Sequence, residues 1–208
     1  MHQELKSMPT FNYFAYGSCM CPQDLARSLG EPMENYIVGT ASLVGYRLGF
    51  YYYSPLRCCG ALDLVEVQGY CHHNGHGNSA HKQHEIPNHI VSGNVVHGVL
   101  YCLPQKFSEA LDRREDVPSQ GYRHHYISVN CRGYVWEDVR TYVVANKQPQ
   151  EIAPNDWYAG VVMRGAENSG LPPEYLYQLQ SHIRKLTESS RLPHPRSHHQ
   201  LAHQPHFT

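Results

Sequence analysis

Short strand-like runs, separated by turn residues, are the feature that most limits what this chain can fold into. Apolar or aromatic runs typical of strands lie at residues 11–16, 36–52 (two runs), 59–67, 94–103, 122–131 and 139–146. Helical periodicity is confined to residues 22–29, 105–115 and 171–186. A parallel sheet of βαβ units needs helices that alternate regularly with the strands. This irregular order therefore predicts the α+β class.

Two polar segments interrupt this pattern. Residues 71–93 are rich in His and Gly and lie between two strand candidates, which is typical of a long surface insertion. Residues 187–208 repeat Pro and His without an apolar period, so we expect a disordered tail there. With 208 residues in all, the sequence predicts one domain over residues 9–186 that carries the insertion at 71–93.

Charge and cysteine content limit the partners and the compartment. Lys and Arg number 17 against 18 Asp and Glu, so bulk charge does not favour nucleic acid. No apolar run reaches the length of a membrane span, and residues 1–10 do not resemble a secretory signal. The 7 Cys are an odd number without a Cys-x-x-Cys pair, which indicates free thiols in a reducing cytoplasm. We therefore expect a cytoplasmic protein with no membrane or nucleic-acid partner.

A Gly-Ser turn directly after an aromatic strand is the first candidate site. It comprises Tyr16, Gly17, Ser18, Cys19 and Met20. Backbone N–H groups in such a turn can hold a carboxylate or a developing oxyanion without any charged side chain. The alternative is an ordinary turn.

A charge-rich segment at the end of a predicted helix is the second candidate. It runs from Leu111 to Val117 and is followed by Gly121-Tyr122. An acid just past a helix end, beside a Pro-Ser-Gln-Gly loop, can lie in a cleft and pass protons. The alternative is a solvated cluster of two Arg beside acidic residues.

The third candidate segment runs from Gly165 to Tyr175. Its residues predict a connecting turn followed by a helix that has Pro in its first helical turn. Its simplest interpretation is a capped helix start.

Taken together, these segments resemble the gamma-glutamylcyclotransferase family. The family's pattern is a strand running into Tyr-Gly-Ser-Asn, then Leu-Asp-x-x-Glu-Gly-Val with a Tyr seven residues after the Glu, then Gly-Ala-x-Glu-Asn-Gly-Leu-Pro-x-Glu-Tyr. Here they read YFAYGSCM, LDRREDV with Glu115 and Tyr122, and GAENSGLPPEY, in the same order. The resemblance covers residues 11–185. It implies a gamma-glutamylcyclotransferase-like mixed β-barrel or sheet with a few flanking helices.

The resemblance also implies a reaction. The free α-amine of a small gamma-glutamyl substrate attacks its own γ-carbonyl, pyroglutamate forms, and an amino acid or amine leaves, without metal or cofactor. Glu115 is the implied general acid and base. The implied substrate-binding residues are Tyr16, Gly17, Ser18, Cys19, Met20, Tyr122, Tyr142 and Tyr158. For the three last tyrosines, core aromatics with satisfied hydroxyls are an equal alternative. Relatives dimerise, so a homodimer stays open.

Two departures from the pattern keep other functions open. Cys19 stands where the family usually has Asn, and a thiol is only a weak donor that cannot copy an amide. Asp116 stands where the family usually has Gly, and it adds a like charge beside Glu115. A module that binds gamma-glutamyl ligands without turnover is therefore the alternative function.

A metal-handling protein is a less favoured hypothesis. It would use Cys71, His72, His73, His76, His81, His84 and His89 of the insertion. Their spacing matches no recognised ligand set, so adventitious binding is the favoured interpretation and we assign no metal site.

Overall fold

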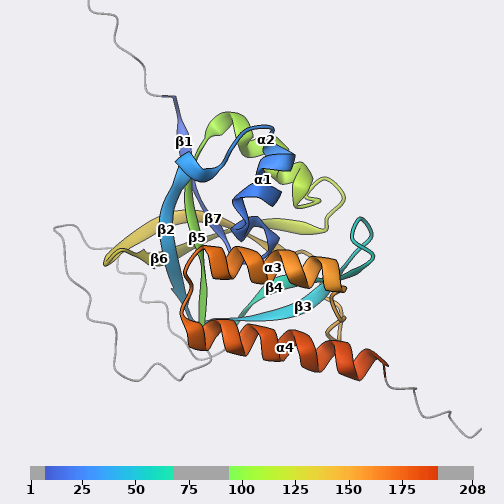
Figure 1. Cartoon of the computed structure of the whole chain (residues 1–208). Coiled ribbons are helices and arrows are strands. Elements are labelled where there is room, and N and C mark those ends of the chain that lie inside the picture. Colours follow the sequence, from blue (N-terminus) through green and yellow to red (C-terminus); the bar gives the residue numbers. More distant parts are fainter. Residues whose placement is uncertain (1–7, 68–93, 192–208) are drawn as a thin grey trace, which may run out of the picture.

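The computed structural model describes residues 8–67 and 94–191 (Figure 1). The predictions for the insertion at 71–93 and for residues 192–208 therefore lie outside the described residues. The strands are β1 (Thr10–Ala15), β2 (Ile37–Val44), β3 (Tyr46–Ser54), β4 (Cys59–Glu66), β5 (Val95–Pro104), β6 (Tyr122–Cys131) and β7 (Tyr134–Val144). The α-helices are α1 (Pro22–Leu29), α2 (Ser108–Arg114), α3 (Asp156–Asn168) and α4 (Pro173–Arg191). Short 3₁₀ turns are η1 (Ser18–Met20), η2 (Glu34–Tyr36) and η3 (Gln105–Phe107).

A closed barrel organises the fold. Its strand order is β1-β5-β2-β6-β7, and β7 closes it by pairing in parallel with β1, where Tyr13 faces Arg140. The other barrel pairs are antiparallel. Strands β3 and β4 form a separate two-stranded sheet. Helices α3 and α4 pack against each other, and α1 packs against α2 (Figure 1). This architecture confirms the predicted α+β class and the mixed barrel.

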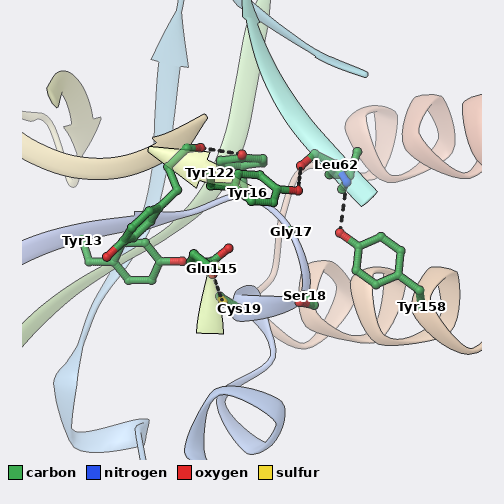
Figure 2. A pocket seen from close by; sticks show the side chains of 10 residues that line it. Tyr13, Tyr16, Gly17, Ser18, Cys19, Leu62, Glu115, Tyr122 and Tyr158 are labelled. Carbon is green, nitrogen blue, oxygen red and sulfur yellow. Dashed lines mark hydrogen bonds between the residues drawn. The ribbon is translucent and has the colours of Figure 1, made fainter. Parts of the chain in front are cut away.

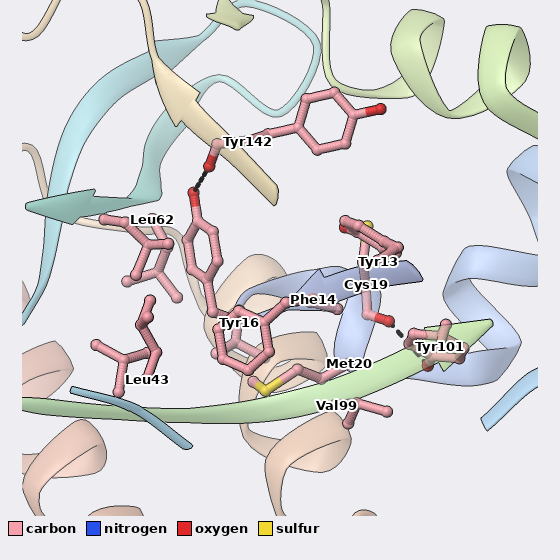
Figure 3. Packing of buried hydrophobic residues seen from close by; sticks show 14 of the residues in the cluster. Tyr13, Phe14, Tyr16, Cys19, Met20, Leu43, Leu62, Val99, Tyr101 and Tyr142 are labelled. Atoms are coloured by element: carbon pink, nitrogen blue, oxygen red, sulfur yellow. Dashed lines mark hydrogen bonds between the residues drawn. The ribbon is translucent and has the colours of Figure 1, made fainter. Parts of the chain in front are cut away.

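The barrel interior holds the main core. Strand β5 lies between β1 and β2, and most of its side chains are buried. Phe14 of β1, Met20 of η1 and Val99 of β5 pack together there (Figure 3). Apolar burial of this kind is the main favourable contribution to folding. Because Met20 follows β1 by only a few residues, this packing anchors the candidate loop to the barrel.

Helix α3 is the element that the sequence analysis missed. Its sequence contains Gly160 and Gly165, which weaken local helix propensity. Asn155 caps its start, since the Asn155 Oδ1 accepts a hydrogen bond from the Tyr158 N–H at 2.8 Å. One face of the helix is buried, and this tertiary packing offsets the weak propensity.

Three predicted boundaries are corrected as well. Residues 165–168 belong to the last helical turn of α3 rather than to a connecting turn. The connecting turn comes after them and includes Gly170, whose φ is 68°. Helix α4 continues to Arg191, so residues 187–191 are helical and do not belong to a tail. Strand β7 begins at Tyr134 rather than at residue 139, because pairing with β6 extends it beyond the apolar run.

Candidate active site

A small cavity lies where the end of β1, the η1 turn and the end of α2 meet strand β4 and helix α3 (Figure 2). The volume open to the centres of water-sized groups is about 30 Å³, which is enough for at least one water molecule. The wall is mostly tyrosine with one carboxylate, and consists of Tyr13, Tyr16, Gly17, Ser18, Cys19, Leu62, Glu115, Tyr122, Tyr142 and Tyr158.

The turn after β1 supplies backbone donors. The N–H of Met20 donates to the Gly17 carbonyl at 3.0 Å, and the N–H of Cys21 donates to the Ser18 carbonyl at 3.1 Å. Within the described part of the chain, no acceptor is recorded for the N–H groups of Gly17, Ser18 and Cys19. The first N–H groups of a helical turn lack internal partners and suit an anion.

Close packing holds this turn against helix α3. A Cβ atom on Gly165 would lie 2.7 Å from the backbone nitrogen of Cys21 and 3.0 Å from the carbonyl carbon of Met20. Only a residue without a side chain fits such an approach of two backbones. Gly165 of the Gly-Ala motif therefore allows the η1 turn to pack closely against α3. The interpretation of this motif as a helix start did not include that role.

Glu115 is the carboxylate that faces the cavity. It lies at the C-terminal end of α2 and is partly exposed, and its Oε1 accepts a hydrogen bond from the Cys19 thiol at 3.0 Å (Figure 2). Burial raises the pKa of the Cys19 thiol to about 12. The thiol therefore stays protonated at neutral pH and acts as the donor.

The neighbouring charges all have partners elsewhere. Arg113 pairs with Glu109 on the exposed side of α2. Asp112 accepts from the Tyr142 hydroxyl at 2.5 Å. The two Arg therefore do not form the single solvated cluster that was the alternative interpretation.

Arg114 turns in the opposite direction from Arg113. Its guanidinium is buried against Asp24 of α1, and each of these side chains is only 8% exposed. Its Nε also donates to the Cys19 sulfur at 3.0 Å, and its Nη2 donates to the Ser18 hydroxyl at 3.2 Å. This network links α1, α2 and the η1 turn directly behind Glu115.

Asp116 lies beside Glu115 in sequence but faces another partner. Its Oδ2 accepts from the Tyr52 hydroxyl at 2.7 Å, and its backbone has a φ of 53°. Glycine is the usual residue at such a left-handed position, and Asp is one of the few others that tolerate it. The local backbone thus explains how Asp replaces the Gly of the family pattern.

Three tyrosines of the wall form hydrogen bonds with the backbone through their hydroxyls. Tyr16 donates to the Tyr142 carbonyl at 2.6 Å, and Tyr122 donates to the Leu62 carbonyl at 2.7 Å (Figure 2). The Tyr158 hydroxyl accepts from the Leu62 N–H at 3.1 Å. Burial raises the pKa of Tyr16 and Tyr122 well above the ordinary value, so both stay neutral. These contacts fit rigid aromatic walls with satisfied hydroxyls.

The structure brings all but one of the predicted site residues to the cavity. Met20 is the exception, because its fully buried side chain packs in the core. Sequence reasoning missed Tyr13 and Leu62, which also line the cavity. Tyr13 lies on β1, three residues before Tyr16, and strand alternation gave no signal that both would line one cavity. Nothing local indicated Leu62.

The described residues hold neither a cluster of metal ligands nor a membrane-spanning helix. Across 8–67 and 94–191, no group of three or more His, Cys, Asp or Glu side chains could hold a metal ion. Within these ranges no helix combines the length and the apolar character needed to cross a bilayer. The His-rich candidate ligands lie outside the described residues.

Comparisons with known proteins match this architecture. The model of the AIG2-like family matches residues 95–179. The chain is 32% identical to YkqA of Bacillus subtilis over 190 residues, which are 89% of this chain and 57% of YkqA. It is 28% identical over 178 residues to the gamma-glutamylcyclotransferase of Mus musculus, covering 83% of this chain and 78% of the mouse protein. The chain thus spans little more than half the length of YkqA.

Solved structures agree with the sequence matches. The crystal structure of YkqA from Bacillus subtilis superposes with a TM-score of 0.67 at 29% identity, covering 87% of this chain and 56% of YkqA. A structure of a gamma-glutamyl cyclotransferase superposes with a TM-score of 0.65 at 21% identity, covering 83% of this chain and 88% of that one. At that identity the second match shows the fold alone.

Proposed function

We propose that this chain, which matches the gamma-glutamylcyclotransferase family in sequence and fold, converts a gamma-glutamyl amino acid or amine into pyroglutamate and the free amine. The single observation that carries this proposal is the position of Glu115. Its carboxylate faces a tyrosine-walled cavity beside a turn whose N–H groups lack acceptors within the described residues. A base and an anion-binding turn are the two parts that an intramolecular acyl transfer needs.

The proposed reaction moves two protons in turn through Glu115, from the α-nitrogen to the leaving nitrogen. The carboxylate takes a proton from the α-ammonium of the substrate, which frees the amine to attack the γ-carbonyl carbon. A new C–N bond closes the five-membered ring, and the carbonyl oxygen becomes an oxyanion. The oxyanion collapses, the original amide C–N bond breaks, and Glu115 returns the first proton to the leaving nitrogen. Glu115 then takes the second proton from the positively charged ring nitrogen, which leaves a neutral lactam, and passes it to the departing amine, which leaves as an ammonium ion. No water, cofactor or metal is consumed in these steps.

The η1 turn has two tasks in this scheme. The N–H groups of Gly17, Ser18 and Cys19 can donate to the oxyanion or to a substrate carboxylate. The rigid tyrosine wall holds the substrate in a folded conformation. Because both reacting groups belong to one molecule, this positioning supplies a large part of the rate.

The contact between Cys19 and Glu115 leaves the carboxylate available to the ammonium group of a substrate. A thiol is a weak donor, whereas the ammonium group of a substrate is a strong and charged one. The substrate can therefore replace the thiol at Glu115 at small cost.

We also propose a reducing, cytoplasmic location. The cysteines among the described residues are all free thiols, namely Cys19, Cys21, Cys58, Cys59, Cys102 and Cys131. Free thiols of this number are typical of proteins from a reducing compartment.

The decisive experiment measures pyroglutamate release from a panel of gamma-glutamyl amino acids and gamma-glutamyl amines. We expect release by the wild-type protein, and a loss of about 10²-fold to 10⁴-fold in kcat for Glu115→Gln. Glu109→Gln is the matched control, because this acid lies on the same helix and its side chain is 84% exposed. EDTA should leave the rate unchanged. No release from any donor by the wild type would contradict the proposal and favour the binding module.

A further inference from the structure

A second and larger cavity lies where α4 passes strand β3 and the start of β5 (Figure 1). The volume open to the centres of water-sized groups is about 290 Å³, close to the size of pockets that hold small organic ligands. It shares no residue with the cavity of Glu115, so the proposed reaction makes no use of it. Its wall consists of Arg47, Leu48, Val95, Val96, Tyr175, Gln178, Leu179 and His182.

Half of this wall is aliphatic. Val96 and Leu179 are buried, and Leu48 and Val95 are partly buried. The four side chains come from β3, β5 and α4, so three elements meet around one apolar surface. A ligand with an apolar body would remove this surface from water, which favours binding.

Tyr175 contributes a polar group without a partner. Its hydroxyl oxygen is buried and accepts or donates no hydrogen bond within residues 8–67 and 94–191. The backbone of His97 approaches this hydroxyl but does not reach hydrogen-bonding geometry. The Tyr175 ring packs edge-on against the His97 ring, with centroids 5.0 Å apart. A buried hydroxyl without a partner costs free energy, and an acceptor atom in the cavity would remove that cost.

Arg47 supplies a positive charge at the same cavity. Its guanidinium lies over the ring of Tyr51, 5.8 Å from the centroid, and its Nη2 donates to the Tyr51 hydroxyl at 3.4 Å. Across the described part of the chain, no carboxylate forms an ion pair with Arg47. His182 is already paired, because its Nε2 lies 2.9 Å from the Glu151 Oε1. The charge left for a ligand is therefore positive.

We propose that this cavity binds a small carboxylate that has an apolar body and no ammonium group. The carboxylate accepts hydrogen bonds from the exposed Arg47 guanidinium and from the Tyr175 hydroxyl. The Gln178 amide, which has no hydrogen-bond partner among the described residues, is a further donor. The apolar body packs on the aliphatic half of the wall. An ammonium group finds no counter-ion, since no Asp or Glu of residues 8–67 and 94–191 lines the cavity.

The test compares three compounds with the same carbon skeleton. Isocaproate carries the charge and the apolar body, isocaproamide lacks the charge, and leucine adds an ammonium group. In a ligand-observed NMR titration of the full chain at neutral pH, we expect isocaproate to bind about 10-fold tighter than either of the others. No binding of isocaproate up to about 5 mM would overturn the inference, and so would equal affinity for isocaproate and isocaproamide. Leucine that binds as tightly as isocaproate would overturn it as well.

Arg47→Gln locates the binding at this cavity. It should weaken isocaproate about 10-fold or more and change isocaproamide less than about 3-fold. Arg184→Gln is the matched control, because Arg184 is an exposed arginine of α4 that pairs with Glu188 and does not line the cavity. It should leave both affinities unchanged. An equal loss in the two variants would show an effect of general charge and overturn the inference.

Tyr175→Phe gives an independent readout with opposite effects on the free and the bound protein. Because it removes an unpartnered hydroxyl, it should raise the melting temperature of the ligand-free protein by about 2 to 4 °C. It should also weaken isocaproate by about 3-fold to 10-fold, since the carboxylate loses a donor. A lower melting temperature would show that the hydroxyl already has a partner and would overturn the inference, as would unchanged affinity. Neither measurement depends on turnover, so the proposed function and this site succeed or fail separately.

Discussion

Replacing Asp24 with Asn should destabilise the whole domain, because it removes the counter-ion of a buried guanidinium. Asp24 and Arg114 are each 8% exposed and join α1 to the end of α2. Arg114 also donates to Ser18, Cys19 and Ser28. The amide keeps the size of the carboxylate but not its charge. The substitution therefore leaves a largely buried positive charge without its hydrogen-bonded carboxylate.

The size of the effect follows from this burial. Breaking a buried ion pair by removing one partner costs about 3 to 5 kcal/mol of unfolding free energy. In a domain of this length each kcal/mol lowers the melting temperature by about 2 to 4 °C, so the expected drop is about 6 to 20 °C. Replacing both partners with apolar residues, as in Asp24→Leu with Arg114→Met, should recover most of the stability. It should not recover activity, because Cys19 and Ser18 lose their donor.

Urea unfolding, followed by tryptophan fluorescence, measures the free energy, and calorimetry measures the melting temperature. Asp138→Asn is the control. This exposed Asp has a φ of 53°, and Asn tolerates that conformation equally well. If Asp24→Asn lowers the free energy of unfolding by less than about 1 kcal/mol, the reasoning is refuted, because an exposed ion pair contributes that much. A double variant that is less stable than the single one would also refute it.

Three further outcomes are expected. Gly165→Ala should destabilise the domain by about 1 to 3 kcal/mol in urea unfolding and lower kcat/KM, because the new methyl group would lie 2.7 Å from the Cys21 nitrogen; unchanged values would contradict this close approach. In mass-spectrometric iodoacetamide labelling at pH 7.5, exposed Cys58 should react well before buried Cys19, whose thiol has a pKa of about 12; equal rates would argue against the buried thiol. Burial lowers the pKa of His97 below its ordinary 6.5. As the pH drops, the unfolded chain therefore binds a proton at His97 more readily than the folded chain does, and the free energy of unfolding falls below about pH 6.5. His97→Gln should reduce the difference between the unfolding free energies measured in urea at pH 7.5 and at pH 5.5. An unchanged difference would show that His97 is not its source.

Local sequence was sufficient for most strands and for the order of the motifs. Alternating apolar residues and turn residues act over a few positions, so the strand runs and the helix start at Pro22 could be predicted from neighbours alone. The acid at 115 and the turn at 16–20 were found by their chemistry and by a family pattern. Both reach one cavity because the fold places the end of α2 against the end of β1.

The sequence by itself determined which residue types could do the chemistry, but only the tertiary structure decided which of them meet. The charges at 112–116 look alike in sequence, yet they turn to different partners, and only Glu115 faces the cavity. Helix α3 depends on packing that offsets its two glycines. The Arg57 guanidinium lies over the ring of Tyr158, although the two residues are 101 positions apart in the sequence. Such contacts depend on barrel closure and helix docking, which bring distant segments together and leave no signal at short range.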